Sequence, residues 1–172
     1  MGRPPLRRAG WAGRRALAPR TAAILVLALC AGLMTGCRSG PPLPPADLTA
    51  PGWRVQNGQA VWRPGRARPE LAGDLLLATN LTGSLFVQFA KPPFPLALAR
   101  VEHDRWQIQF GAGVYSRLGR GEPPPRFVWF QLARALVGAS LGRGWQVHHP
   151  APHTWRLENS RTGEWLEGRF AP

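Results

Sequence analysis

The sequence is poor in cysteine and in acidic side chains. Its two cysteines, Cys30 and Cys37, both lie near the N-terminus, so the chain beyond residue 37 contains no thiol and no disulfide. A domain built from that part must be held together by packing alone. Nine acidic residues are scattered among 22 basic ones, and no close pair of carboxylates points to acid–base catalysis. Lys91 is the only lysine, so arginine carries nearly all of the positive charge.

The first 36 residues have the pattern of a secretory signal peptide. Residues 1–20 contain six arginines and no acidic residue, and residues 21–34 (TAAILVLALCAGLM) carry no charge. A basic start, a short apolar run and small residues at the exit are typical of secretory signals. The run is too short for a transmembrane helix, which needs about 20 apolar residues. Two Arg-Arg pairs, at residues 7–8 and 14–15, leave the export route open.

The residues Leu33-Met34-Thr35-Gly36-Cys37 define the type of signal. They resemble the lipobox of bacterial lipoproteins, in which an apolar residue and two small ones precede a cysteine. The resemblance implies a signal peptide over residues 1–36, cleavage between Gly36 and Cys37, and attachment of lipid to the Cys37 thiol. Two or three acyl chains anchor firmly, because each buried methylene contributes about 0.8 kcal/mol. The alternative is an uncleaved leader that contains a cysteine by chance.

Residues 37–51 join this lipidated cysteine to the rest of the chain. The stretch 38–51 (RSGPPLPPADLTAP) is rich in proline and has no apolar periodicity, which predicts an extended tether between the membrane and the folded domain. Residue 38 is arginine and not aspartate. By resemblance to lipoproteins of two-membrane bacteria, this residue implies sorting to the outer membrane, facing the periplasm.

Removal of the signal peptide leaves 16 basic and 9 acidic residues, a net charge of +7. On an exported and membrane-anchored domain this charge favours anionic lipid head groups over nucleic acid as a partner. An arginine-rich coding bias would explain the same composition.

Residues 52–172 are long enough for one domain but not for two. Hydrophobic residues alternate with a period of two over most of this part, which predicts β-strands. The expected strands cover residues 53–56, 59–63, 71–79, 84–91, 96–102, 105–110, 114–118, 145–149, 155–159 and 164–170.

Short polar pairs predict how some of these strands are joined. Asn57-Gly58 is a strong signal for a two-residue hairpin turn, and His103-Asp104 predicts a second hairpin. In the strand after His103-Asp104, Trp106, Ile108 and Phe110 alternate with polar residues. We therefore expect that strand to have one dry face and one solvated face.

One segment breaks the alternation. Residues 127–137 (FVWFQLARALV) follow three prolines and precede Gly138, as expected of a short helix. Because this helix is apolar almost all round, it must be covered on most sides. The sequence therefore predicts a mainly β fold with one main α-helix, in which a curved antiparallel sheet, a barrel or half-barrel, wraps on the helix.

The order of elements resembles the LolA/LolB superfamily of periplasmic half-barrels, which handle lipoproteins. The most specific likeness is residues 85–110 (LFVQFAKPPFPLALARVEHDRWQIQF). The chain departs from LolB-like proteins in being shorter and in having one clear helix instead of several. The resemblance implies a non-enzymatic protein that binds lipid or lipoprotein acyl chains. It also implies that Pro93, Phe94 and Pro95 form the loop that helps to insert a received lipoprotein into the membrane.

Two structural alternatives remain open. Phe94 either projects from a stiff, unpaired loop or is tucked onto the domain. The sheet and helix either enclose an apolar cavity or pack into a filled core, and a filled core favours an envelope protein that binds a protein partner. The core residues expected in both cases are Leu85, Val87, Phe89, Leu98, Trp106, Ile108, Trp129, Phe130, Trp155 and Leu166.

Catalytic and metal motifs are weak. The segment 138–142 (GASLG) fits the G-x-S-x-G pattern of hydrolases, but a helix precedes Ser140 where that motif needs a strand. His148, His149 and His153 form a loose cluster that prolines interrupt, with no cysteine or carboxylate to complete a metal site. The glycines at 119–121 and 142–144 lack the phosphate-loop pattern. We therefore expect no catalytic residue, no metal and no cofactor.

Overall fold

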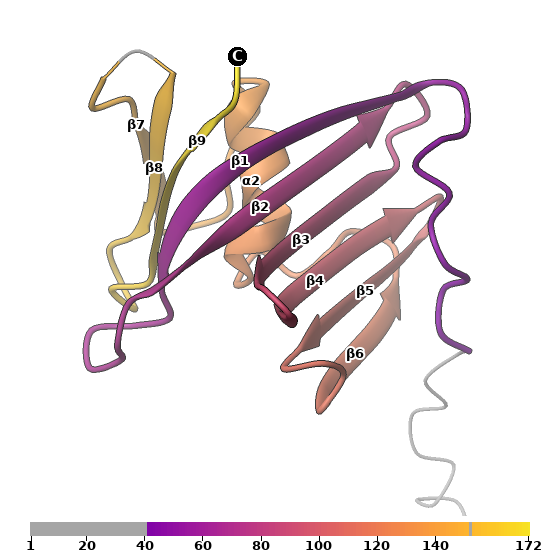
Figure 1. Cartoon of the computed structure of the whole chain (residues 1–172). Coiled ribbons are helices and arrows are strands. Elements are labelled where there is room, and N and C mark those ends of the chain that lie inside the picture. Colours follow the sequence, from indigo (N-terminus) through magenta and orange to yellow (C-terminus); the bar gives the residue numbers. More distant parts are fainter. Residues whose placement is uncertain (1–40, 152) are drawn as a thin grey trace, which may run out of the picture. The chain divides into compact units, whose positions relative to one another are not determined.

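The computed structural model describes residues 41–151 and 153–172, which form one antiparallel sheet of nine strands and one helix (Figure 1). The proposed signal peptide and Cys37 lie outside the described residues. The helix is α2 (Val128–Leu136). The strands are β1 (Trp53–Arg63), β2 (Leu71–Asn80), β3 (Leu85–Lys91), β4 (Phe94–Glu102), β5 (Arg105–Phe110), β6 (Tyr115–Arg120), β7 (Trp145–His148), β8 (Thr154–Asn159) and β9 (Trp165–Phe170).

Two meanders make the sheet. Strands β1 to β6 follow one another as hairpins, α2 leads from β6 to β7, and β7 to β9 form a second meander. The two meanders join because β9 pairs with β1, so the first and last strands are neighbours inside the sheet. The sheet is open, with β6 and β7 at its edges. The predicted curved antiparallel sheet with one helix is confirmed, but the sheet does not close into a barrel.

The core lies between α2 and the face of the sheet that curves around it (Figure 1). Aromatic rings fill much of this space. The Trp129 ring centroid of α2 lies 5.1 Å from that of Trp62 on β1 and 5.2 Å from that of Phe89 on β3. Phe130 of α2 packs edge-on against Trp106 of β5 at 6.0 Å. Contacts of this kind add stability beyond the burial of area.

Nine of the ten predicted core residues are buried, and Leu98 is the exception. On β4 the buried Ala97 and Ala99 point into the core. Because side chains alternate along a strand, Leu98 faces the opposite side, where it is half-buried opposite Gln88. The prediction failed because β4 has alanines on its core face. Leu98 is larger and more hydrophobic than Ala97 and Ala99, so the sequence predicts it on that face in their place.

The hairpin predicted at Asn57-Gly58 is wrong, because both residues lie within the continuous strand β1. Gly58 pairs with Leu75 of β2 on one side and with Phe170 of β9 on the other. A Cβ atom at Gly58 would overlap the carbonyl oxygen of Arg169. The glycine therefore permits close approach of β9 instead of making a turn.

The helix begins and ends as its flanking residues predict. Prolines precede it, and at its C-terminal end Gly138 adopts a φ of 69°. The N–H of Gly138 donates to the Ala135 carbonyl at 3.1 Å, and the N–H of Ala139 donates to the Arg134 carbonyl at 2.9 Å. These bonds satisfy carbonyls that the last turn leaves free, in the manner of glycine-capped helices.

Candidate functional site

The predicted lipid-attachment residue Cys37 and the cleavage position at Gly36 lie outside the described residues. Among the first described residues, Pro41 and Leu43 nevertheless contact the sheet directly. This segment and the turns of the first meander hold the candidate functional features.

The tether residue Leu43 is buried against the outer face of the sheet, 7% exposed. Its N–H donates to Gln107 Oε1 at 3.0 Å, and its carbonyl accepts a hydrogen bond from Arg100 Nη1 at 3.2 Å. Arg105 donates to the carbonyl of Pro41. From Pro41 onward the proline-rich segment is therefore part of the folded domain.

This contact corrects the expected solvated face of β5. Gln107 is 3% exposed and Arg100 on the neighbouring strand is 7% exposed, because Leu43 covers both and uses their hydrogen-bonding groups. Burial lowers the pKa of Arg100, and the Glu102 carboxylate, 3.8 Å from its guanidinium, opposes that shift. Sequence reasoning missed this site because period-two patterning does not reveal which distant segment covers a strand.

Pro93, Phe94 and Pro95 lie at the β3–β4 hairpin. Pro92 and Pro93 form its tight turn, and Phe94 is the first residue of β4, in register with Lys91. The expectation that Phe94 stands on an unpaired loop is wrong, because Phe94 pairs with Lys91 and Pro95 pairs with Ala90, next to a register shift between Phe89 and Ala90. Its side chain is nevertheless 66% exposed.

The β5–β6 turn lies beside this hairpin. The N–H of Gly111 donates to the Leu96 carbonyl at 3.1 Å, and the N–H of Ala112 donates to the Pro95 carbonyl at 3.2 Å. The turn carries Val114, which is 92% exposed, and leads into Tyr115, which is 40% exposed. We call Phe94, Val114 and Tyr115 the apolar tip.

A wide, open groove of about 1290 Å³ lies at the C-terminal end of β9. Its apolar lining includes Leu75, Leu136, Trp155 and Phe170. Its polar lining consists of Gln56, Asn57, Gln59, Asp74, Gln88, His149, His153, Thr154 and Arg169. Pro92, two residues before Phe94, also lines the groove, so the groove extends to the turn that carries the apolar tip.

One acidic residue has a strongly shifted pKa. Burial raises the pKa of Glu164 to about 7, although a hydrogen bond from Trp62 opposes the shift. The Trp62 Nε1–H donates to Glu164 Oε1 at 3.0 Å. A carboxyl with a perturbed pKa can mark a functional site. Glu164, however, lies at the end of the core where β1 pairs with β9, and its partner there is the core residue Trp62.

The discounted motifs lie on loops. Ser140 is exposed after α2, and its carbonyl accepts a hydrogen bond from Arg134 at 2.9 Å. His148 ends β7, while His149 and His153 border the groove. Within the described residues, no three His, Cys, Asp or Glu side chains gather at a potential metal site.

The described residues define a mainly β domain, with an open antiparallel sheet, one short helix and an N-terminal segment bound to the outer face. Comparisons with protein-family models, curated proteins and solved structures give no match. Over residues 41–151 and 153–172, no helix is both long and apolar enough to cross a membrane.

Proposed function

We propose that this chain is a lipid-anchored protein of the outer membrane, facing the periplasm, that binds lipid or lipoprotein acyl chains in LolB-like fashion without catalysing a reaction. The signal sequence, the lipobox ending at Cys37 and the arginine at position 38 support this location. The membrane, reached through the lipid on Cys37, is its first partner, and no cofactor is required.

The exposure of Phe94 carries the proposal. Phe94 is 66% exposed and Val114 on the adjacent turn is 92% exposed. Full burial of such a side chain is worth about 1.5–3 kcal/mol, so a lipid surface that receives the apolar tip gains free energy. Neighbouring exposed apolar residues commonly mark interaction sites.

The groove offers a path for an acyl chain next to the apolar tip. The half-buried Leu136 and Phe170 supply accessible apolar lining, and Arg169 supplies a positive charge suited to an anionic head group. Acyl chains would bind in this open groove, since aromatic rings occupy the space between α2 and the sheet.

The test is transfer of a second lipoprotein into vesicles by the lipid-modified protein. Phe94→Glu should reduce insertion at least tenfold while leaving the unfolding transition unchanged. Leu81→Glu is the matched control, because Leu81 is fully exposed in the β2–β3 turn and its substitution should have no effect. Equal insertion by the Phe94→Glu protein and the wild type would remove the apolar tip from the mechanism.

The filled space between α2 and the sheet favours a second function, an envelope assembly lipoprotein that binds a protein partner. Titration with a fluorescent fatty acid separates the two. Saturable binding supports the first function. Absence of saturable binding, together with stoichiometric capture of one envelope protein, supports the second.

A further inference from the structure

The contact of Pro41 and Leu43 with the sheet, which we call the tether contact, limits the distance between the domain and the membrane. Pro41 is held by Arg105, and Leu43 is held by Gln107 and Arg100. Whatever its conformation, the chain from Cys37 to Pro41 spans no more than about 14 Å, because each residue adds at most about 3.6 Å. If Cys37 carries the anchor, as proposed above, the part of the domain around Pro41 must lie close to the bilayer.

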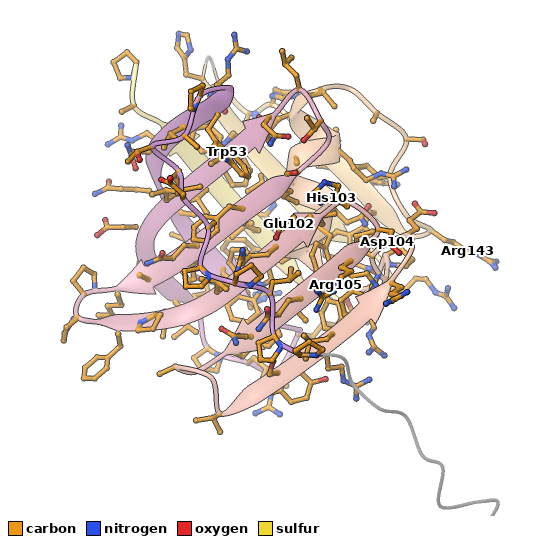
Figure 2. The ribbon with its side chains drawn as sticks, turned by 90° about the vertical axis from the view of Figure 1, so that its right-hand side faces the viewer. Trp53, Glu102, His103, Asp104, Arg105 and Arg143 are labelled. Atoms are coloured by element: carbon orange, nitrogen blue, oxygen red, sulfur yellow. The ribbon has the colours of Figure 1, made fainter. Side chains whose placement is uncertain are left out.

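The edge strand β6 runs from the apolar tip to the residues that hold Pro41. At its C-terminal end, Arg120 is in register with Arg105, the residue that holds Pro41. At its N-terminal end, β6 begins at Tyr115 of the apolar tip. Figure 2 views the end of the sheet nearest the tether, where the turn from Glu102 to Arg105 lies. The strand is roughly 20 Å long at about 3.3 Å per residue.

The side chains of β6 suit an anionic surface. Arg117 and Arg120 lie on opposite faces of the strand, so both faces of the edge carry positive charge. Arg105 lies in register with Arg120 of β6 on one side and with Glu102 of β4 on the other. The Glu102 carboxylate therefore offsets part of the repulsion between the two arginines, and Arg120 stands at the open edge beyond Arg105. The Arg117 guanidinium lies over the Tyr115 ring, 5.4 Å from its centroid. Arginine beside aromatic and aliphatic residues is a composition suited to the membrane interface.

From the position of the tether, the charges and the apolar tip, we propose that the β6 edge lies along the surface of an anionic bilayer. Arg117 and Arg120 contact the lipid phosphates, while Val114 and Tyr115 enter the head-group region. The unpaired backbone groups of β6 stay among polar head groups and water and need not enter hydrocarbon. This inference rests on the lipid anchor of the proposed function and assigns the orientation of the domain.

The experiment uses the lipid-modified protein in vesicles with or without anionic lipid. A fluorophore on Ser116→Cys reports on β6, and the same fluorophore on Ser140→Cys, an exposed position after α2, is the control. A head-group quencher should quench the Ser116→Cys label several-fold more than the Ser140→Cys label in anionic vesicles. In neutral vesicles this difference should shrink, because each arginine near an anionic surface strengthens contact about fivefold.

Arg117→Glu with Arg120→Glu should abolish the difference, whereas Arg117→Lys with Arg120→Lys should keep it. Unfolding curves check that each variant folds. Equal quenching at the two labels would overturn the proposal. Quenching at β6 that is the same in the arginine variants and in neutral vesicles would overturn it as well. Protection of β6 by a soluble protein in place of lipid would also overturn it. This assay does not measure lipoprotein insertion. If the Phe94→Glu protein inserts lipoprotein as well as the wild type does, and the β6 label is still quenched, the proposed function is rejected and the orientation of the domain is not.

Discussion

The indole N–H of Trp62 donates to Glu164 Oε1 at 3.0 Å, although 102 residues separate the two in the chain. The bond joins β1 to the residue that precedes β9, at the end of the core where the two meanders meet. Glu164 is half-buried there, and this burial favours its neutral form and raises its pKa to about 7.

This relationship predicts a pH-dependent stability. The folded protein holds the Glu164 proton up to about pH 7, whereas the unfolded chain releases it near the ordinary value of 4.5. Between these values the folded state binds more protons, so the free energy of unfolding falls as pH rises. The full loss from this group is about 3 kcal/mol, since a pKa difference of one corresponds to about 1.36 kcal/mol. Glu164→Gln should remove that part of the pH dependence and be more stable than wild type at pH 8, as measured by urea unfolding. Parallel pH profiles for the two proteins would contradict this assignment.

Gly58 should tolerate no side chain. Gly58→Ala would place Cβ against the Arg169 carbonyl, and backbone atoms of β9 would have to move. We expect a loss of about 1–3 kcal/mol in the free energy of unfolding. Gly65→Ala is the control, since the nearest atom to its Cβ is 3.8 Å away, and its effect should stay within about 0.5 kcal/mol. Equal stabilities for the two variants would mean that β9 does not approach β1 as described.

The tether contact should be visible in hydrogen exchange. The Leu43 amide is bonded to Gln107, so it should exchange more slowly than the amides of exposed residues nearby. Gln107→Ala should remove that protection. Leu43→Ala should cost about 2 kcal/mol or more of stability, whereas Pro44→Ala, at an exposed neighbour, should cost little. Fast exchange of Leu43 in the wild type would show that the segment is free in solution.

The lipid attachment predicts a defined mass. Protein made with its own leader in a bacterial host should begin at Cys37 and carry two or three acyl chains. Cys37→Ala should remain uncleaved and unacylated, while Cys30→Ala should be processed normally. Mass spectrometry and labelling with a palmitate analogue decide the outcome. An unacylated wild-type protein that retains residues 1–36 would refute the anchor.

The alternation of hydrophobic residues and the positions of proline and glycine predicted most strands and the helix. Strand β5 alternates apolar and polar residues, and α2 is an apolar run between prolines and Gly138; the structure places both as expected. Local pattern could not predict which strands pair over long distances. Asn57-Gly58 has the residues of a turn, yet pairing with β2 and β9 holds it extended. The burial of Gln107 likewise depends on Leu43, which lies 64 residues away in the chain.

The exposure of Phe94 could not be decided from sequence either, because a proline-flanked aromatic fits a covered or an open turn equally well. The same limit applied to Glu164, an ordinary surface residue in the sequence. Its burial and the hydrogen bond from Trp62 distinguish Glu164 from the other acidic residues, and both depend on the tertiary fold.

The pairing of β9 with β1 also constrains the order of folding. The inner strand β1 gains its second neighbour only after β9 has been made, about 100 residues later. Until then, the backbone of residues 58–63 is an unprotected edge in what will be the interior of the sheet. A product truncated before Trp165 would therefore lack β9, leave β7 and β8 unpaired with the first meander, and expose this edge to other chains. Rapid completion of synthesis, or a chaperone that shields β1, would protect the nascent protein from aggregation.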